Sequence, residues 1–224
     1  MKISIPKISM PNITYNAPVV LTYTLIAFLV FLIDAYLLTD FSKKYFSVAS
    51  FSFYNPMDYF RMISHTMGHS GWGHFFGNIM FIAALGPILE SKYGSWTMLE
   101  MFSITAVLSA LYTVCLSSTG MYGGSGIVFA LIVAASITNS KEGNGIPLTF
   151  ILIIMIYLLK EVGGLFVDDG ISHAGHLIGG GGVGAIYGFA LLKENDEEIK
   201  EVYKGEMNGV KSVGQIPHTK EEVK

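Results

Sequence analysis

The feature that most constrains this chain is a series of apolar runs, each close to the length of a membrane-spanning helix. A helix rises 1.5 Å per residue, so about 20 residues cross a hydrocarbon layer of about 30 Å. Charged residues make up only 14% of the 224 residues, and they are sparse inside these runs. Because lipid offers the backbone no hydrogen bonds, such runs fold as helices. The sequence therefore predicts an all-α integral membrane protein.

Six spans are expected, and they cover residues 19–38, 74–89, 96–116, 125–137, 146–161 and 173–192. Residues 39–73 form a long loop in which aromatic side chains are interleaved with a few charges. This pattern favours short helices that lie in the membrane interface. The predicted fold is a six-transmembrane-helix bundle over residues 19–192, with a long interfacial first loop and a short fourth helix.

The basic residues predict that both termini face the cytoplasm. Ten of the 14 Lys and Arg side chains would then lie on the inner side and four on the outer side. Residues 1–18 would form a cytoplasmic segment, and residues 193–224, with six lysines and eight acids, a charged and flexible cytoplasmic tail. The first apolar run ends without a cleavage site, and the N-terminus lacks an arginine-rich presequence. We therefore expect a retained first span and a prokaryotic cytoplasmic membrane.

The stretch MYGGSGIVFA, residues 121–130, places Ser125 among three glycines at the start of the fourth span. A helix of thirteen residues reaches only about 20 Å, so this span should begin inside the hydrocarbon layer. Unpaired N–H groups at a helix start favour negative charge, and an oxyanion formed there would find donors. The alternative is that Ser125 only caps the helix while the glycines allow close packing.

A base for this serine is expected in the sixth span, ISHAGHLIGGGGVGAIYGFALL. Glycines recur every four residues along one face of this span, which lets the helix approach a partner closely, and the expected partner is the glycine-flanked start of the fourth span. His176 lies about one turn into the span, at the depth inferred for Ser125. An imidazole in a membrane helix normally faces the protein interior, so His176 is the predicted general base. His173, one turn nearer the surface, is the competing base or a residue of the cavity rim.

His74 and Asn78 lie four residues apart at the start of the second span, on one helical face. Together they could donate hydrogen bonds to an oxyanion, or they could form a structural polar network that joins the loop to the helix. A zinc ion held by His65, His69 and His74 is a rival reading. No HExxH motif or closely spaced carboxylate supports it, so we expect neither metal nor cofactor. The net charge of −3 indicates no nucleic-acid partner.

The motifs GGSG, HFFGN and GHLIGG of spans four, two and six together resemble those of the rhomboid intramembrane serine proteases. The resemblance implies a Ser–His dyad without a third acid, in which Ser125 is the nucleophile and His176 the base. It also implies an oxyanion site formed by His74, Asn78 and the Ser125 N–H group. The implied substrates are transmembrane proteins, cleaved near their outer ends within the lipid membrane.

The same resemblance assigns structural positions to Arg61 and His69 in the first loop and to Glu90 at the inner end of the second span. Phe129 stands four residues after the nucleophile, where the family often has tyrosine, and is expected to pack on the His176 ring.

Glu161 lies beside Lys160 near the outer end of the fifth span, and we expect an interfacial acid paired with that lysine. Two rival functions are a rhomboid-like pseudoenzyme that binds or escorts membrane proteins, and a transporter. The presence of both Ser125 and His176 argues against the pseudoenzyme. The two halves of the chain share no motif, which argues against the inverted repeat of a transporter.

Overall fold

The computed structural model describes residues 14–117, 120–139, 148–166 and 172–190. These residues are folded into helices and connecting loops, with one isolated β-bridge between Val48 and Met121. The prediction of an all-α fold is confirmed for this part of the chain. The expected N-terminal segment 1–18 is described only from residue 14, and the expected tail 193–224 lies outside the described residues.

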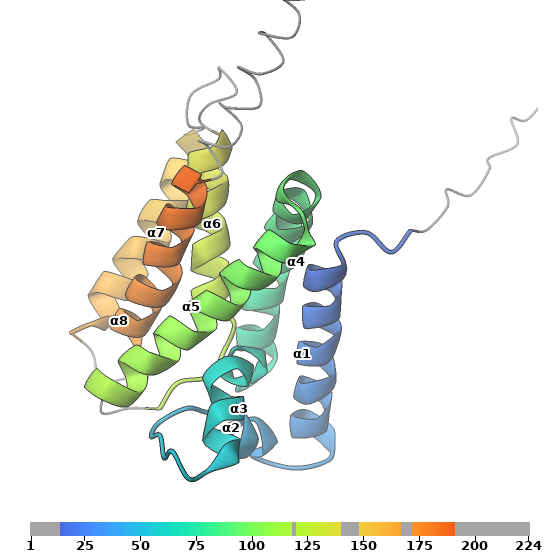
Figure 1. The fold of residues 1–224 in the computed structure, drawn as a ribbon, viewed down its shortest axis with the longest axis vertical. Coiled ribbons are helices and arrows are strands. Elements are labelled where there is room, and N and C mark those ends of the chain that lie inside the picture. The colour runs from blue at the N-terminus through green and yellow to red at the C-terminus, as the bar shows by residue number, and fades with distance from the viewer. Residues whose placement is uncertain (1–13, 118–119, 140–147, 167–171, 191–224) are drawn as a thin grey trace, which may run out of the picture.

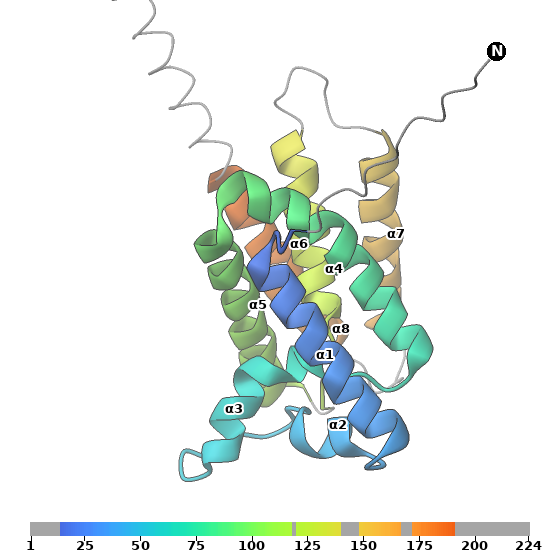
Figure 2. The ribbon, with the colours of Figure 1, turned by 90° about the vertical axis from the view of Figure 1, so that its right-hand side faces the viewer.

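Among the described residues, three helices are long and apolar enough to cross a membrane: α1 (Pro18–Tyr36), α4 (Trp72–Tyr93) and α5 (Ser95–Leu116). Two shorter apolar helices are α6 (Ser125–Asn139) and α7 (Leu148–Gly164). The last helical segment begins as α8 (His173–His176), continues as the π-helical η2 (Leu177–Gly182), and is α-helical again over residues 183–190. Each expected span therefore coincides with a helix to within a few residues where the chain is described. Figures 1 and 2 show these helices side by side as one bundle.

α6 lies in the centre of this bundle and contacts α4, α5, α7 and η2. Almost every described side chain from Ser125 to Thr138 is buried, although the helix is short. Small residues make the close packing possible: a Cβ atom added to Gly184 would lie 2.5 Å from the carbonyl oxygen of Ala130 in α6. The expectation that the glycine face of the sixth span packs on the fourth is therefore confirmed.

The N-terminus of α1 is held by a side chain from a distant part of the chain. Glu90 of α4 is 3% exposed, and its two carboxylate oxygens accept hydrogen bonds from the backbone N–H groups of Val19 and Val20, each at 2.9 Å. The first N–H groups of a helix have no partner within the helix, and a carboxylate also interacts favourably with the helix dipole. Glu90 is thus a structural acid that joins α4 to α1.

The long first loop contains α2 (Phe41–Tyr45), α3 (Pro56–Ser64) and the 3₁₀ turn η1 (His65–Met67), which lie at one end of the bundle (Figures 1 and 2). Arg61 joins two of these elements. Its Nη1 atom donates to Asp58 Oδ1 at 2.9 Å, and its Nη2 atom donates to the carbonyl oxygen of Lys44 at 2.6 Å. Arg61 therefore links α3 to the end of α2.

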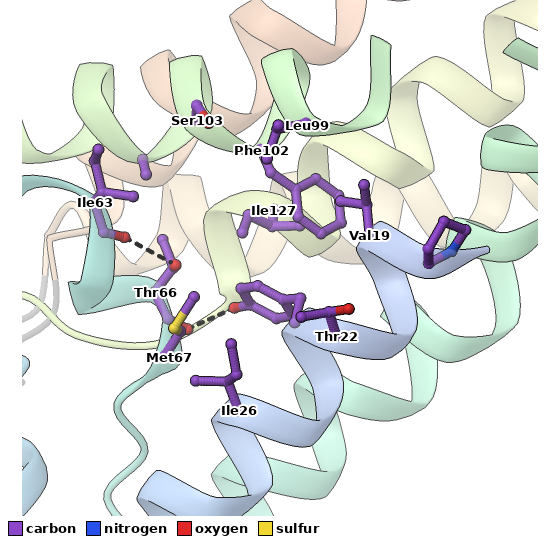
Figure 3. Close-up of a pocket in the computed structure, with 13 residues that line it drawn as sticks. Val19, Thr22, Ile26, Ile63, Thr66, Met67, Leu99, Phe102, Ser103 and Ile127 are labelled. Atoms are coloured by element: carbon purple, nitrogen blue, oxygen red, sulfur yellow. Dashed lines mark hydrogen bonds between the residues drawn. The ribbon is translucent and has the colours of Figure 1, made fainter. Parts of the chain in front are cut away.

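A cavity of about 380 Å³ lies between α1, the end of the first loop and α5 (Figure 3). Its walls are mainly apolar, and Tyr23 donates a hydrogen bond of 2.7 Å to the carbonyl oxygen of Thr66 within it. Neither Ser125 nor His176 lines this cavity.

Candidate active site

Ser125 is the first residue of α6, and the backbone before it is held by the first loop. Gly123 has a φ of +129°, a conformation that L side chains rarely adopt, and its N–H group donates to the carbonyl oxygen of His65 at 2.9 Å. Met121 and Val48 exchange two backbone hydrogen bonds, of 2.8 and 3.0 Å. These contacts fix the turn that precedes Ser125, whose side chain is 7% exposed.

The structure brings Ser125 and His176 together across 51 residues of sequence. Ser125 Oγ lies 2.8 Å from His176 Nε2, and both residues are buried. Close approach of the two helices depends on glycine, since a Cβ atom added to Gly180 would overlap the backbone of Gly126. In the tautomer that carries its proton on Nδ1, His176 can accept the hydroxyl proton of Ser125.

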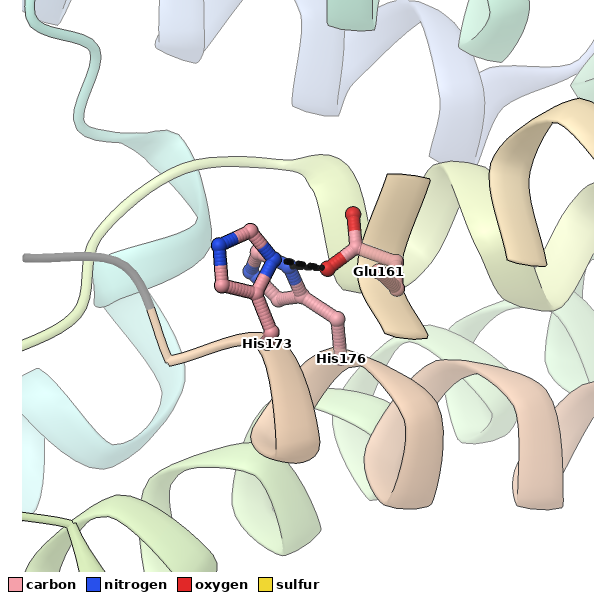
Figure 4. A group of neighbouring side chains, drawn as sticks. All are labelled: Glu161, His173 and His176. Atoms are coloured by element: carbon pink, nitrogen blue, oxygen red, sulfur yellow. Dashed lines mark hydrogen bonds and ion pairs between the residues drawn. The ribbon is translucent and has the colours of Figure 1, made fainter. Parts of the chain in front are cut away.

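Glu161 of α7 lies behind this pair, and its position differs from the expected one. It is 1% exposed, and its Oε2 atom accepts from His176 Nδ1 at 3.0 Å and from His173 Nδ1 at 2.8 Å. Figure 4 shows the carboxylate of α7 facing both rings of α8. The expectation of an interfacial acid is therefore wrong. His173 is also buried, with 4% of its surface exposed, and it contacts the same carboxylate.

His74 and Asn78 face the turn before Ser125 from α4. A Cβ atom added to Gly123 would lie 2.6 Å from His74 Nε2 and 3.8 Å from Asn78 Nδ2. The N–H group of Ser70 points at His74 Nδ1 at 3.4 Å, so the neutral ring carries its proton on Nε2, the atom nearer Gly123. Asn78 Nδ2 is buried and has no hydrogen-bond partner among the described residues. Both residues thus direct donors toward the start of α6.

His65 and His69 are buried within the first loop, where their ring nitrogens contact the backbone. His65 Nδ1 contacts the carbonyl oxygen of Arg61 at 3.1 Å, and His69 Nδ1 contacts that of Met67 at 3.1 Å. Burial lowers the pKa of His65 to about 4 and that of His69 to about 3, so both rings are neutral at pH 7. Both contacts join a histidine ring to the backbone of the first loop.

Phe129 differs from expectation in its ring contact. Its ring is stacked on that of Tyr157 in α7, with centroids 6.0 Å apart, and no ring contact with His176 occurs within the described part of the chain. Gly181 also lies against it, since an added Cβ atom would be 2.7 Å from Phe129 Cε1. Phe129 therefore packs between α7 and the sixth span.

The described residues whose ligand atoms converge closely enough for a metal ion are Glu161, His173 and His176, with these atoms within 4.8 Å of one another. This is a different set from the three histidines of the first loop and second span considered from the sequence. Two imidazoles and a carboxylate suit zinc or a similar cation by ligand type.

A bundle of apolar helices, with a serine and a histidine in buried contact at the start of its central helix, is typical of an integral membrane protein. The Rhomboid domain model matches residues 56–194, more than half of the chain, so the chain belongs to the rhomboid family. The chain is also 26% identical over 143 residues to Rhomboid protease GlpG of Haemophilus influenzae, an alignment that covers 62% of this chain and 73% of that protein. The resemblance inferred from the three motifs is confirmed.

Proposed function

We propose that this chain is an intramembrane serine endopeptidase that cleaves transmembrane proteins near their extracytoplasmic ends. The observation that carries the proposal is the 2.8 Å contact between Ser125 Oγ and His176 Nε2 at a buried position of a rhomboid-family chain. The relative from Haemophilus influenzae is named a rhomboid protease, which supports the same class of activity.

In the proposed reaction, Ser125 is the nucleophile and His176 the general base. The hydroxyl proton moves from Oγ to Nε2 as Oγ attacks the scissile carbonyl carbon, which gives a tetrahedral intermediate and an imidazolium ion. His176 then gives that proton to the leaving amine, and the peptide bond breaks to an acyl-enzyme ester. A water molecule, deprotonated by the same nitrogen, hydrolyses the ester and restores Ser125.

The oxyanion of the intermediate would lie between the start of α6 and α4. Three donors are available there: the Ser125 N–H group, Asn78 Nδ2 and His74 Nε2. The buried Nδ2 atom supports this role because it has no partner among the described residues and is already desolvated. A preorganised donor of this kind is stronger in a site with little water.

The proposed membrane arrangement has six spans, both termini in the cytoplasm and the first loop outside, in a prokaryotic cytoplasmic membrane. Substrate and lipid would then meet the bundle laterally. A peptide bond in a helix is shielded by its own hydrogen bonds, so the substrate must unwind locally before Ser125 reaches it. We therefore expect small or helix-breaking residues near the cleaved bond.

The test is cleavage of a single-span reporter by purified protein in detergent, together with labelling by a fluorophosphonate probe. Ser125→Ala should abolish both, while Ser136→Ala should leave both within about twofold, because Ser136 lies about three turns further along α6, away from the Ser125–His176 pair. Ser136 is a matched control: it is buried in the same helix, and its hydroxyl donates to the carbonyl oxygen of Ile132 at 2.7 Å. Cleavage by Ser125→Ala at the wild-type rate would refute the mechanism.

A wild-type chain that binds single-span proteins but neither cleaves them nor reacts with the probe would instead support the pseudoenzyme.

The base is assigned separately, by comparing His176→Ala with His173→Ala. The proposal requires that His176→Ala abolish fluorophosphonate labelling. Full labelling of that variant would exclude His176 as the base.

A further inference from the structure

Glu161 is a buried carboxylate to which the Ser125–His176 mechanism assigns no role. Its side chain is 1% exposed, inside a bundle of apolar helices. A buried carboxylate is costly unless hydrogen bonds and charge partners compensate for its lost hydration. In a membrane helix such a group by default indicates function. What Glu161 contacts therefore decides what it does.

The contacts form a continuous chain from the carboxylate to the serine. Oε2 of Glu161 lies 3.0 Å from Nδ1 of His176, and Nε2 of the same ring lies 2.8 Å from Ser125 Oγ. A carboxylate only accepts hydrogen bonds, so His176 carries its proton on Nδ1 and presents the lone pair of Nε2 to the hydroxyl. This tautomer is the one that a general base needs.

We infer that Glu161 is a positioning residue that completes a Ser125–His176–Glu161 triad in this chain. The inference rests on the proposed function. When the hydroxyl proton moves from Oγ to Nε2, His176 becomes a cation and Glu161 remains a carboxylate, so the two charges attract. The proton on Nδ1 stays on the ring throughout, and the hydrogen bond keeps the ring oriented in both charge states.

His173 holds the carboxylate in this orientation. Its Nδ1 atom donates to the same oxygen at 2.8 Å, from one helical turn before His176. The ring has room there because residue 164 is glycine, and a Cβ atom at Gly164 would overlap the His173 ring. α7 therefore supplies both the acid and the space for the residue that fixes it.

The same three side chains could instead hold a divalent cation, and the geometry favours the hydrogen-bonded arrangement. Separations of 2.8 and 3.0 Å are those of N–H···O hydrogen bonds. A metal ion on Nδ1 of His176 would leave the ring proton on Nε2. That nitrogen could then not accept the proton of Ser125, so a metal-loaded site would be inactive.

The activity test uses Glu161→Gln, which keeps the shape of the side chain but removes its charge. We expect kcat to fall about 100-fold or more while KM changes less than about threefold, since the lost interaction acts mainly in the transition state. Fluorophosphonate labelling should slow in parallel. Glu100→Gln is the matched control, because Glu100 accepts a hydrogen bond from Tyr187 at an exposed position. Its kcat should stay within about twofold of wild type.

A second measurement does not depend on activity or on the stability of a Glu161 variant. In wild-type protein labelled with ¹⁵N-histidine, the signal that disappears in His176→Ala should report a proton on Nδ1. A proton on Nε2 overturns the triad, and so does Glu161→Gln with more than half of the wild-type kcat. Two results with metal would also overturn the triad and assign the cluster to a metal ion. One is activation of the wild type by a chelator. The other is inhibition by Zn²⁺ at micromolar concentration that requires Glu161.

These outcomes separate the triad from the proposed function. If wild type cleaves and Ser125→Ala does not, the protease stands whatever Glu161→Gln does. If wild type neither cleaves nor labels, the proposed function fails together with the catalytic role of Glu161.

Discussion

Asn78→Leu should lower activity without lowering stability. Asn78 is 4% exposed, and its Nδ2 atom has no hydrogen-bond partner among the described residues. An unsatisfied buried donor costs about 1–3 kcal/mol in the resting protein. Leucine has the same branched shape and no polar atom, and a substitution of this kind in a core costs less than about 1.5 kcal/mol in packing. The free energy of unfolding should therefore stay unchanged or rise by about 1 kcal/mol.

The effect on activity should be opposite, because in the proposed mechanism this donor acquires its partner only when the oxyanion forms. Loss of one oxyanion donor lowers kcat by about 10²- to 10³-fold, which corresponds to about 3–4 kcal/mol. The assay is single-span reporter cleavage under saturating substrate, with unfolding by SDS in mixed micelles measured on the same preparations. Asn78→Asp serves as a second variant: it should lose as much activity and also be less stable, because it buries an unpaired charge.

The refuting result for Asn78→Leu is cleavage within about threefold of wild type, which would remove Asn78 from the oxyanion site. A variant that loses both activity and more than about 2 kcal/mol of stability would also contradict the reasoning, because it would make Asn78 a structural residue.

The other predictions concern packing and pH. Gly184→Ala should destabilise the protein by about 1–3 kcal/mol, because its Cβ would lie 2.5 Å from the carbonyl oxygen of Ala130. The control, Gly182→Ala, should cost much less, because nothing lies within 4 Å of the added atom. Equal losses of stability in SDS unfolding would contradict this prediction. Burial lowers the pKa of His65 in the folded protein to about 4, while the pKa in the unfolded chain is about 6.5. As the pH falls from about 6.5 to 4, the His65 imidazole is therefore protonated in the unfolded chain before it is protonated in the folded protein. Up to about 3 kcal/mol of stability should be lost over that interval. Unfolding measured between pH 4 and 7 should show this dependence in wild type and a weaker one in His65→Gln.

The sequence was sufficient to predict the helices and the pairing of Ser125 with His176. The apolar runs predicted helices at the described positions, because the requirement for internal hydrogen bonds in lipid acts on each segment separately. Ser125 was expected at the start of a short helix, and α6 does begin there. The four-residue glycine period gave the reason why His176 would lie near it, since that period determines which face of the helix approaches its partner.

The contacts that α7 makes with neighbouring helices were harder to predict from the sequence. Glu161 was interpreted through its neighbour in the sequence, although its structural partners lie 12 and 15 residues further along. The available signal was an acid in an apolar span at the same end as two histidines. Phe129 was placed on His176 by analogy, yet its ring stacks on Tyr157. Such contacts depend on how α7 is rotated about its own axis, and a uniformly apolar helix carries little pattern that determines this rotation.

The hydrogen bonds from Val19 and Val20 to Glu90 also bear on the order in which the chain is assembled during synthesis. α1 leaves the ribosome first, but the carboxylate that accepts from its first turn is about 70 residues further along. Until α4 has been made, those two amides must have another partner, such as water or lipid headgroups. A nascent chain arrested before residue 90 should therefore expose the start of α1 to hydrogen exchange, and one arrested after α4 has inserted should protect it.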